Sequence, residues 1–141
     1  MITVGVDLAA QPQNTAIARL HWRDGQAHAE LVQLDADDEV VIEAVGTSVV
    51  TGIDCPLGWP ETFLTFLSSQ RRGTLNPPPD PGVEWRRGLA YRRTDFAVHE
   101  LTNHWPLSVA TDRIGLTAMR AVSILARLVA AGMAVDRAGG G

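Results

Sequence analysis

The hydrophobic pattern contains two short apolar runs that end in the same way. Residues 2–7 (Ile-Thr-Val-Gly-Val-Asp) and residues 49–54 (Val-Val-Thr-Gly-Ile-Asp) each finish with Gly, a β-branched residue and Asp. Apolar residues that do not alternate with polar ones are typical of strands inside a sheet. The pattern therefore predicts two buried strands, each ending in a carboxylate, Asp7 and Asp54.

The pattern between these runs predicts two more strands and a helix. Residues 15–22 and 27–34 are expected strands, joined by an Asp-Gly turn at Asp24 that is typical of a β-hairpin. Residues 35–46 begin with Asp, carry acids in the first turn and have apolar residues at helical spacing. A helix between two strands normally makes them parallel by a right-handed crossover. The two strand-end carboxylates are therefore expected at one edge of the sheet.

The second half of the chain is less periodic. Helices are expected from Pro60, over residues 94–102 with Thr94 as the N-cap, and over residues 116–133, where the pattern is clearest. Residues 71–93 hold six of the twelve Arg and four Pro, and this composition predicts a long Arg- and Pro-rich loop. The whole chain, residues 1–141, is expected to be a single domain.

Composition excludes several classes of protein. The formal charge of −4 argues against a strongly basic nucleic-acid coat protein. Cys55 is the single cysteine, so an intrachain disulfide and a Cys-based zinc site are excluded, and the thiol is expected to be buried and inert. The apolar stretch over residues 116–133 is interrupted by Arg120 and Arg127. Together with the lack of a leader-type opening, this favours a soluble cytoplasmic protein without membrane contact.

Asp7 and Asp54 are the leading candidates for chemistry. A carboxylate at the end of an apolar strand needs a partner, a cap or a metal ion. Two such carboxylates side by side can hold a divalent hard cation. The alternative, in which each Asp caps the loop that follows it, stays open.

The Arg-rich stretch is a candidate for contact with nucleic acid. Arg binds phosphate oxygens in a bidentate manner, and the rings of Trp85 and Tyr91 could stack on bases. The alternative is a solvated loop.

Five motifs occur together along the chain. They are Gly5-Val6-Asp7-Leu8-Ala9, the run from Gly52 to Pro60, Arg92-Arg93-Thr94-Asp95, the run from Pro106 to Gly115, and Ala118-Met119-Arg120. In this order they resemble a bacterial and archaeal family of unknown function whose members are described as predicted ribonuclease H-like nucleases. The resemblance extends from Met1 to about Met133.

The resemblance implies an α/β fold of the ribonuclease H-like type. Its mixed sheet would start with a three-stranded antiparallel meander, followed by a helix, a parallel fourth strand and then further helices. It also implies that Asp7 and Asp54 belong to an acidic set that binds Mg²⁺ or Mn²⁺. The remaining motif residues are candidates for catalysis (Asp95 and Asp112) or for binding substrate (Arg92, Arg93 and Thr94).

The chain departs from this family in one respect. Family members look longer, with a later acidic residue on a C-terminal helix, so the third carboxylate has no obvious source here. Glu43 lies on the helix before the fourth strand, and Asp136 lies near the end of the sequence. Three alternatives stay open: the C-terminal part of the fold is missing, Asp95 or Asp112 completes the site, or the protein is inactive.

The sequence is therefore consistent with three different functions. The first is metal-dependent cleavage of nucleic acid. The second is ATP binding of the actin-like and sugar-kinase type, which Gly5-Val6-Asp7-Leu8 followed by Asn14-Thr15-Ala16 resembles, although Pro12 lacks the N–H that a phosphate-binding turn uses. The third is an inactive interaction domain, which would form homodimers through an exposed sheet edge or apolar surface.

Overall fold

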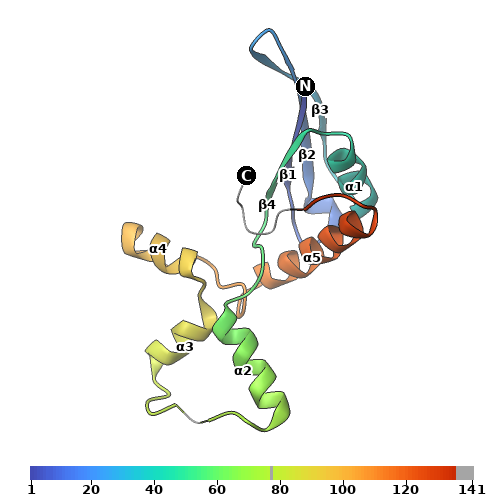
Figure 1. Cartoon of the computed structure of the whole chain (residues 1–141). Coiled ribbons are helices and arrows are strands. Elements are labelled where there is room, and N and C mark those ends of the chain that lie inside the picture. The colour runs from blue at the N-terminus through green and yellow to red at the C-terminus, as the bar shows by residue number, and fades with distance from the viewer. Residues whose placement is uncertain (77, 136–141) are drawn as a thin grey trace. The chain divides into compact units, whose positions relative to one another are not determined.

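A computed structural model describes residues 1–76 and 78–135, and the chain divides into two compact units (Figure 1). The first unit comprises residues 1–57 and 116–141, and the second comprises residues 58–115. Asp136 lies outside the described residues. That the chain forms one domain stays a prediction.

The first unit is built on a four-stranded mixed sheet with the order β3-β2-β1-β4. Its elements are β1 (Ile2–Asp7), the 3-10 turn η1 (Pro12–Asn14), β2 (Ala16–Arg23), β3 (Gln26–Gln33), α1 (Asp38–Gly46), β4 (Val50–Asp54) and α5 (Ile114–Ala130), whose first two residues fall in the second unit. β1 pairs with β2 in antiparallel and with β4 in parallel orientation. The predicted meander, helix and parallel strand are therefore confirmed.

The sheet register follows from the turn and the crossover. The β2–β3 hairpin turns at Asp24 and Gly25, whose φ angles of 51° and 76° are those of the predicted Asp-Gly turn. Across the sheet, Gly5 lies opposite Gly52 in β4 and Ala18 in β2. One face of the sheet centre thus carries small residues.

Helices α1 and α5 cover the other face of the sheet (Figure 1). Alternate residues of β1 point toward these helices, so Val4 and Val6 are buried while Gly5 is exposed. They pack with buried residues of the helices, among them Val41, Ala121, Ile124 and Leu128. Burial of each Val, Leu or Ile side chain among them stabilises the fold by about 1.5–3 kcal/mol.

The prediction that both Asp-ending strands are buried is wrong for β4. Val50 is 61% exposed, and Gly52 is also exposed. β4 is the edge strand of the described sheet, and both α1 and α5 lie on the same face. The opposite face of β4 therefore has no layer from these helices.

The second unit is helical and contains α2 (Glu61–Arg72), α3 (Val83–Ala90) and α4 (Arg93–Thr102). The loop predicted over residues 71–93 is wrong at three places, because α2 continues to Arg72, α3 occupies most of the second half and α4 begins at Arg93. The prolines before residue 82 prevent a helix only up to that point, since Pro disrupts a helix at and just before its own position. Pro60 is the N-cap of α2 and not its first residue.

The cap of α4 also differs from the prediction. Thr94 was expected to cap this helix, but α4 begins one residue earlier, at Arg93. Arg92 is the N-cap residue, and the Asp95 carboxylate accepts from its backbone N–H, as in a capping box. In the described part of the chain, no helix is long and apolar enough to cross a membrane.

Candidate functional site

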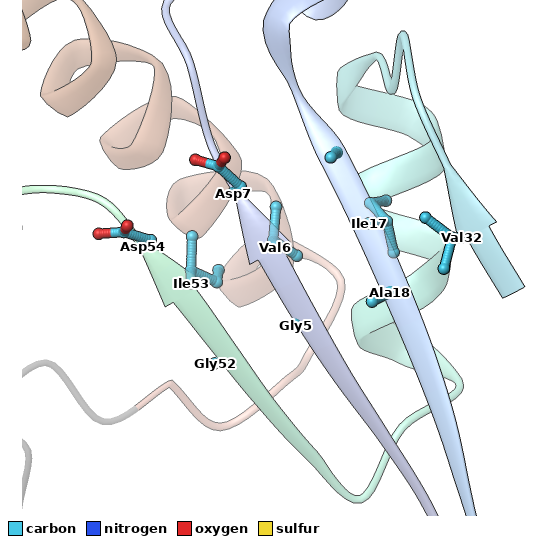
Figure 2. Close-up of a pocket in the computed structure, with 10 residues that line it drawn as sticks. Gly5, Val6, Asp7, Ile17, Ala18, Val32, Gly52, Ile53 and Asp54 are labelled. Carbon is cyan, nitrogen blue, oxygen red and sulfur yellow. The ribbon is translucent and has the colours of Figure 1, made fainter. Parts of the chain in front are cut away.

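Asp7 and Asp54 are register partners at the carboxyl ends of two parallel strands. The backbone supports this pairing, because the Leu8 N–H donates to the Asp54 carbonyl oxygen at 3.3 Å. Figure 2 shows both carboxylates projecting beyond the strand ends in the same direction. The pairing predicted from the sequence is therefore confirmed, and the two carboxylates lie on neighbouring strands.

Both carboxylates are exposed and available for a ligand. Neither forms a side-chain hydrogen bond or an ion pair within residues 1–76 and 78–135. A carboxylate that caps its loop accepts a hydrogen bond from a nearby backbone N–H. The lack of such a bond in the described residues does not support the capping alternative.

The donor set suits a hard cation that keeps part of its water shell. Mg²⁺ is commonly held by one or two carboxylates, with waters and substrate phosphates completing its octahedron. Among the described residues, no group of three or more His, Cys, Asp or Glu side chains is placed to hold a metal ion. Asp7 and Asp54 thus fit such an ion as a two-carboxylate site.

A shallow hollow adjoins the two carboxylates on the face of the sheet opposite α1 and α5 (Figure 2). Its volume is about 520 Å³, and its lining includes Gly5, Gly52 and Ala18. A Cβ atom added to either glycine would meet no atom within 4 Å. The small residues therefore leave space at the centre of the sheet, directly beside Asp7 and Asp54.

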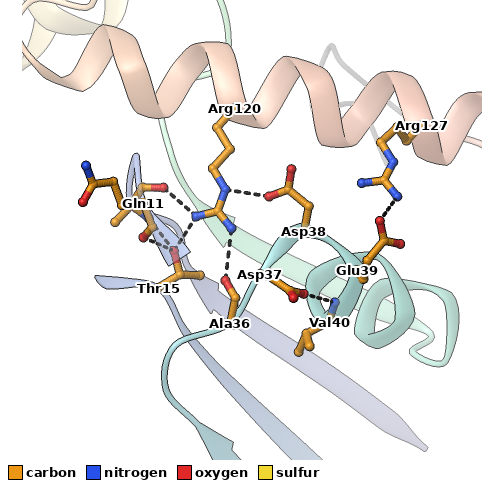
Figure 3. Close-up of polar contacts among 10 residues, drawn as sticks. Gln11, Thr15, Ala36, Asp37, Asp38, Glu39, Val40, Arg120 and Arg127 are labelled. Carbon is orange, nitrogen blue, oxygen red and sulfur yellow. Dashed lines mark hydrogen bonds and ion pairs between the residues drawn. The ribbon is translucent and has the colours of Figure 1, made fainter. Parts of the chain in front are cut away.

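The loop that follows Asp7 is fixed by Arg120 of α5 (Figure 3). Its guanidinium donates to the Ala9 carbonyl at 2.9 Å, to the Thr15 hydroxyl at 2.7 Å and to the Ala36 carbonyl at 3.0 Å. Its Nε also pairs with Asp38 at 2.7 Å. Only 9% of the Arg120 side chain is exposed, so these bonds are shielded from water.

Thr15 completes this network from within the loop. It is 1% exposed, its hydroxyl accepts from the Ala9 N–H and donates to the Gln11 carbonyl, and both distances are 3.2 Å. Arg120 of α5 thus joins the loop after Asp7 to Ala36 and to Asp38 of α1. Neither Arg120 nor Thr15 has a hydrogen bond with Asp7, so each would influence that carboxylate only through the backbone of the loop.

Cys55 follows Asp54 directly and is partly buried. Burial raises the pKa of the thiol, and the negative charge of Asp54 raises it further. A raised pKa keeps the thiol protonated at neutral pH, and the protonated form is a poor nucleophile. This agrees with the expected inert thiol.

Asp95, a candidate catalytic acid from the sequence, lies in the second unit and binds Arg92. Its side chain is 4% exposed, and its two oxygens accept from Arg92 Nε at 3.0 Å and Nη2 at 2.8 Å. Burial alone would raise the pKa of Asp95, but the hydrogen bonds and the charge of Arg92 outweigh it and lower the pKa. Both residues are thereby engaged at the start of α4.

Asp112 also belongs to the second unit, where it supports the turn before α5. Its carboxylate accepts from the Ser108 N–H at 2.7 Å. Ser108 is fully buried, and its hydroxyl donates to the Ala90 carbonyl at 2.6 Å. Asp112 is thus part of a local turn. Arg93 and Thr94, the other candidates for substrate binding, are exposed at the start of α4.

The structure therefore brings together Asp7 and Asp54, whereas Asp95 and Asp112 each have local partners within the other unit. Sequence reasoning did not identify the roles of Arg120 and Thr15. The available signal was an Arg in a largely apolar helix, where a buried charge needs partners. Arg127 of the same helix gives the same signal but is exposed, so the signal alone does not single out Arg120.

Comparison with known proteins supports a family but no activity. A family model described as "Protein of unknown function (DUF429)" matches residues 5–140. No curated protein and no solved structure matches the chain.

Proposed function

Since the chain belongs to this family of unknown function, DUF429, we propose an activity from its own residues: Mg²⁺- or Mn²⁺-dependent hydrolysis of phosphodiester bonds in nucleic acid. The observation that carries the proposal is the side-by-side placement of Asp7 and Asp54 without side-chain partners in the described residues. We further propose that the fold is ribonuclease H-like. The antiparallel meander, the helix and the parallel fourth strand support this assignment.

In the proposed mechanism, Asp7 and Asp54 would hold the divalent cation. When bound, the ion would activate a water molecule and stabilise the negative charge that develops on the scissile phosphate. The hollow around Gly5 and Gly52 would admit the substrate next to the carboxylates. Arg120 would hold the loop after Asp7, so that the Asp7 carboxylate needs little reorganisation during the reaction.

The loop contacts favour this proposal over ATP binding. A phosphate-binding turn needs backbone N–H groups that point at the ligand. Here the N–H groups of Ala9, Asn14 and Thr15 donate to acceptors inside the loop, and Pro12 has none. Fewer donors are therefore left for a nucleotide phosphate.

The test is cleavage of labelled RNA, DNA and RNA–DNA hybrid with Mg²⁺ or Mn²⁺. We expect cleavage of at least one substrate, and a loss of about 100-fold or more in Asp7→Asn and Asp54→Asn, since each removes a charged ligand of the ion. Asp24→Asn is the matched control, because it makes the same chemical change at a hairpin turn where Asn is well tolerated. Cleavage that survives Asp7→Asn would contradict the proposal.

A further inference from the structure

The second unit contains a groove that the proposed metal site does not use. It lies between α2 and α3 and has a volume of about 450 Å³. The Thr62 hydroxyl of α2 donates to the Gly88 carbonyl of α3 at 2.5 Å, so the two helices that form the groove are joined directly. Figure 1 shows these helices in green and yellow.

The lining of this groove is mainly apolar and aromatic, with several short polar side chains and the acid Glu61. Phe66 and Trp85 meet edge to face, with ring centroids 5.8 Å apart. Thr65 and Ser69 of α2 and Asn76 beyond it add hydroxyl and amide groups. A nucleobase suits such a site, because its flat faces pack on aromatic rings while its edge accepts and donates hydrogen bonds.

Arg72 lies one turn beyond Ser69, at the opposite end of α2 from Glu61, the one charged residue that lines the groove. Arg72 shares one face of α2 with Thr65 and Ser69, because residues three, four and seven apart lie on the same side of a helix. Arg72 is exposed, and within residues 1–76 and 78–135 it forms no ion pair. The second unit as a whole holds seven of the twelve Arg but only six of the sixteen acids. A phosphate next to a bound base would find a cation at this end.

A second group of aromatic rings in this unit is already packed internally. Tyr91 and His99 both stack on Trp105, with centroid distances of 4.3 Å and 3.9 Å, and Phe96 meets the same ring edge to face. Tyr91 and His99 lie with a ring face against Trp105, so these faces are not open to a base, whereas Phe66 and Trp85 meet only edge to face. The sequence suggested Trp85 and Tyr91 as rings that could stack on bases. Of these two, Trp85 is therefore the better candidate.

We propose that the groove between α2 and α3 binds one base of a single-stranded nucleic acid, with Arg72 on the adjoining phosphate. The inference rests on the proposed function, since it specifies the substrate as single-stranded. A base paired in a duplex is stacked and cannot enter a groove of this kind.

The test is fluorescence anisotropy with a short labelled single-stranded oligonucleotide, as RNA and as DNA, in EDTA so that no cleavage occurs. Ser69→Trp fills the groove from the surface of α2 and is expected to weaken binding about tenfold or more, the effect of losing one stacked base. Arg72→Gln is expected to weaken binding about threefold and to lower the slope of log K against log salt by about 0.7. Arg113→Gln, an equally exposed Arg of the same unit, is expected to bind like the wild type.

Circular dichroism identifies variants that stay folded, and Arg72→Gln at an exposed helix end provides the test if Ser69→Trp does not fold. Wild-type affinity in both folded variants would overturn the inference, as would equal affinity for duplex and single strand or no binding at all. Binding that depends on the groove, without any cleavage, would support the proposed base site and contradict the proposed nuclease activity. Cleavage that needs Asp7 but is unchanged by Ser69→Trp and Arg72→Gln would support the nuclease activity and contradict the base site.

Discussion

At the residue scale, the clearest electrostatic assignment concerns Asp95. Arg92 lowers the pKa of this carboxylate against the opposing effect of burial. A general acid or base works best with a pKa near the operating pH, and Asp95 is shifted away from it. Its contacts with the side chain and the backbone N–H of Arg92 instead stabilise the start of α4. The charge of Asp95 is therefore used for folding.

We expect Asp95→Asn to lower the free energy of unfolding by about 1–3 kcal/mol at neutral pH, because the charge-assisted hydrogen bonds are lost. The pKa of the folded state lies below that of the unfolded state, so this contribution is complete above about pH 4 and disappears as the pH falls through the folded value. The difference between wild type and variant should therefore shrink in acid. Urea unfolding followed by circular dichroism at pH 7 and pH 3 measures it.

Thr94→Ala is the control for this prediction, since the sequence pattern assigned the cap to Thr94. Thr94 is exposed at the surface of α4, and we expect a change below about 0.5 kcal/mol. A larger loss in Thr94→Ala than in Asp95→Asn would contradict the assignment of the cap.

At the scale of elements, Arg120 joins α5 to α1 and to the loop between β1 and β2. Arg120→Lys keeps the charge but loses the planar set of donors that reaches Ala9, Thr15 and Ala36 together. We expect unfolding to become easier by about 2–4 kcal/mol, because buried acceptors are left without a donor. Denaturant unfolding of the variant provides the measurement.

Arg127→Lys on the same helix is the matched control. Arg127 pairs with Glu39, but the two side chains are 43% and 75% exposed, so the pair is largely solvated. We expect an effect below about 1 kcal/mol. If the two substitutions lowered the free energy of unfolding equally, the buried network of Arg120 would stabilise the fold no more than an exposed ion pair does.

The sequence predicts the elements around Asp7 and Asp54 well, because their signals are local. Strand residues, the Asp-Gly turn and the handed crossover together are enough to place the two carboxylates side by side. The contacts of Arg120 could not be predicted in this way. Two of its acceptors are the backbone carbonyls of Ala9 and Ala36, which have no side-chain signature and lie 111 and 84 residues away in sequence.

The errors in the second unit have a different physical cause. α3 follows a run of prolines, and the prolines hide a helix that begins as soon as the chain passes Gly82. The cap of α4 was assigned to Thr94 by residue preference, but Arg92 and Asp95 form a stronger charge-assisted pair one turn apart. The N-cap preference of a single residue type gives no information about such a pair of side chains.

At the scale of the whole molecule, the separation of charge along the chain coincides with the two units. The second unit holds most of the Arg, while the first holds ten of the sixteen acids, including the proposed metal ligands. This separation is readable from the sequence because it depends on composition alone. Which strand lies at the edge of the sheet is a property of the assembled fold and is not visible in composition.

Within residues 1–76 and 78–135, no strand pairs with the outer edge of β4. The Asp54 carbonyl accepts from the N–H of Leu8, the residue after β1, so by alternation the backbone groups of Thr51 and Ile53 point away from β1. Residues 50–53 contain no charge and no Pro, and Val50 is 61% exposed. The other edge strand, β3, pairs with β2 through a register irregularity, a feature that protects edges.

We therefore expect the protein to self-associate through β4 as its concentration rises. Two copies of β4 in antiparallel orientation would pair Thr51 with Ile53 of the other copy and place Gly52 at the twofold axis, where no side chains collide. Size-exclusion chromatography with light scattering should show a mass that increases with concentration.

Val50→Lys should shift the protein to the monomer, because a charge on an edge opposes pairing. Val32→Lys, at a similarly exposed residue of β3, should leave association unchanged. A wild-type protein that stays monomeric at all concentrations would contradict the expectation, as would equal effects of the two substitutions.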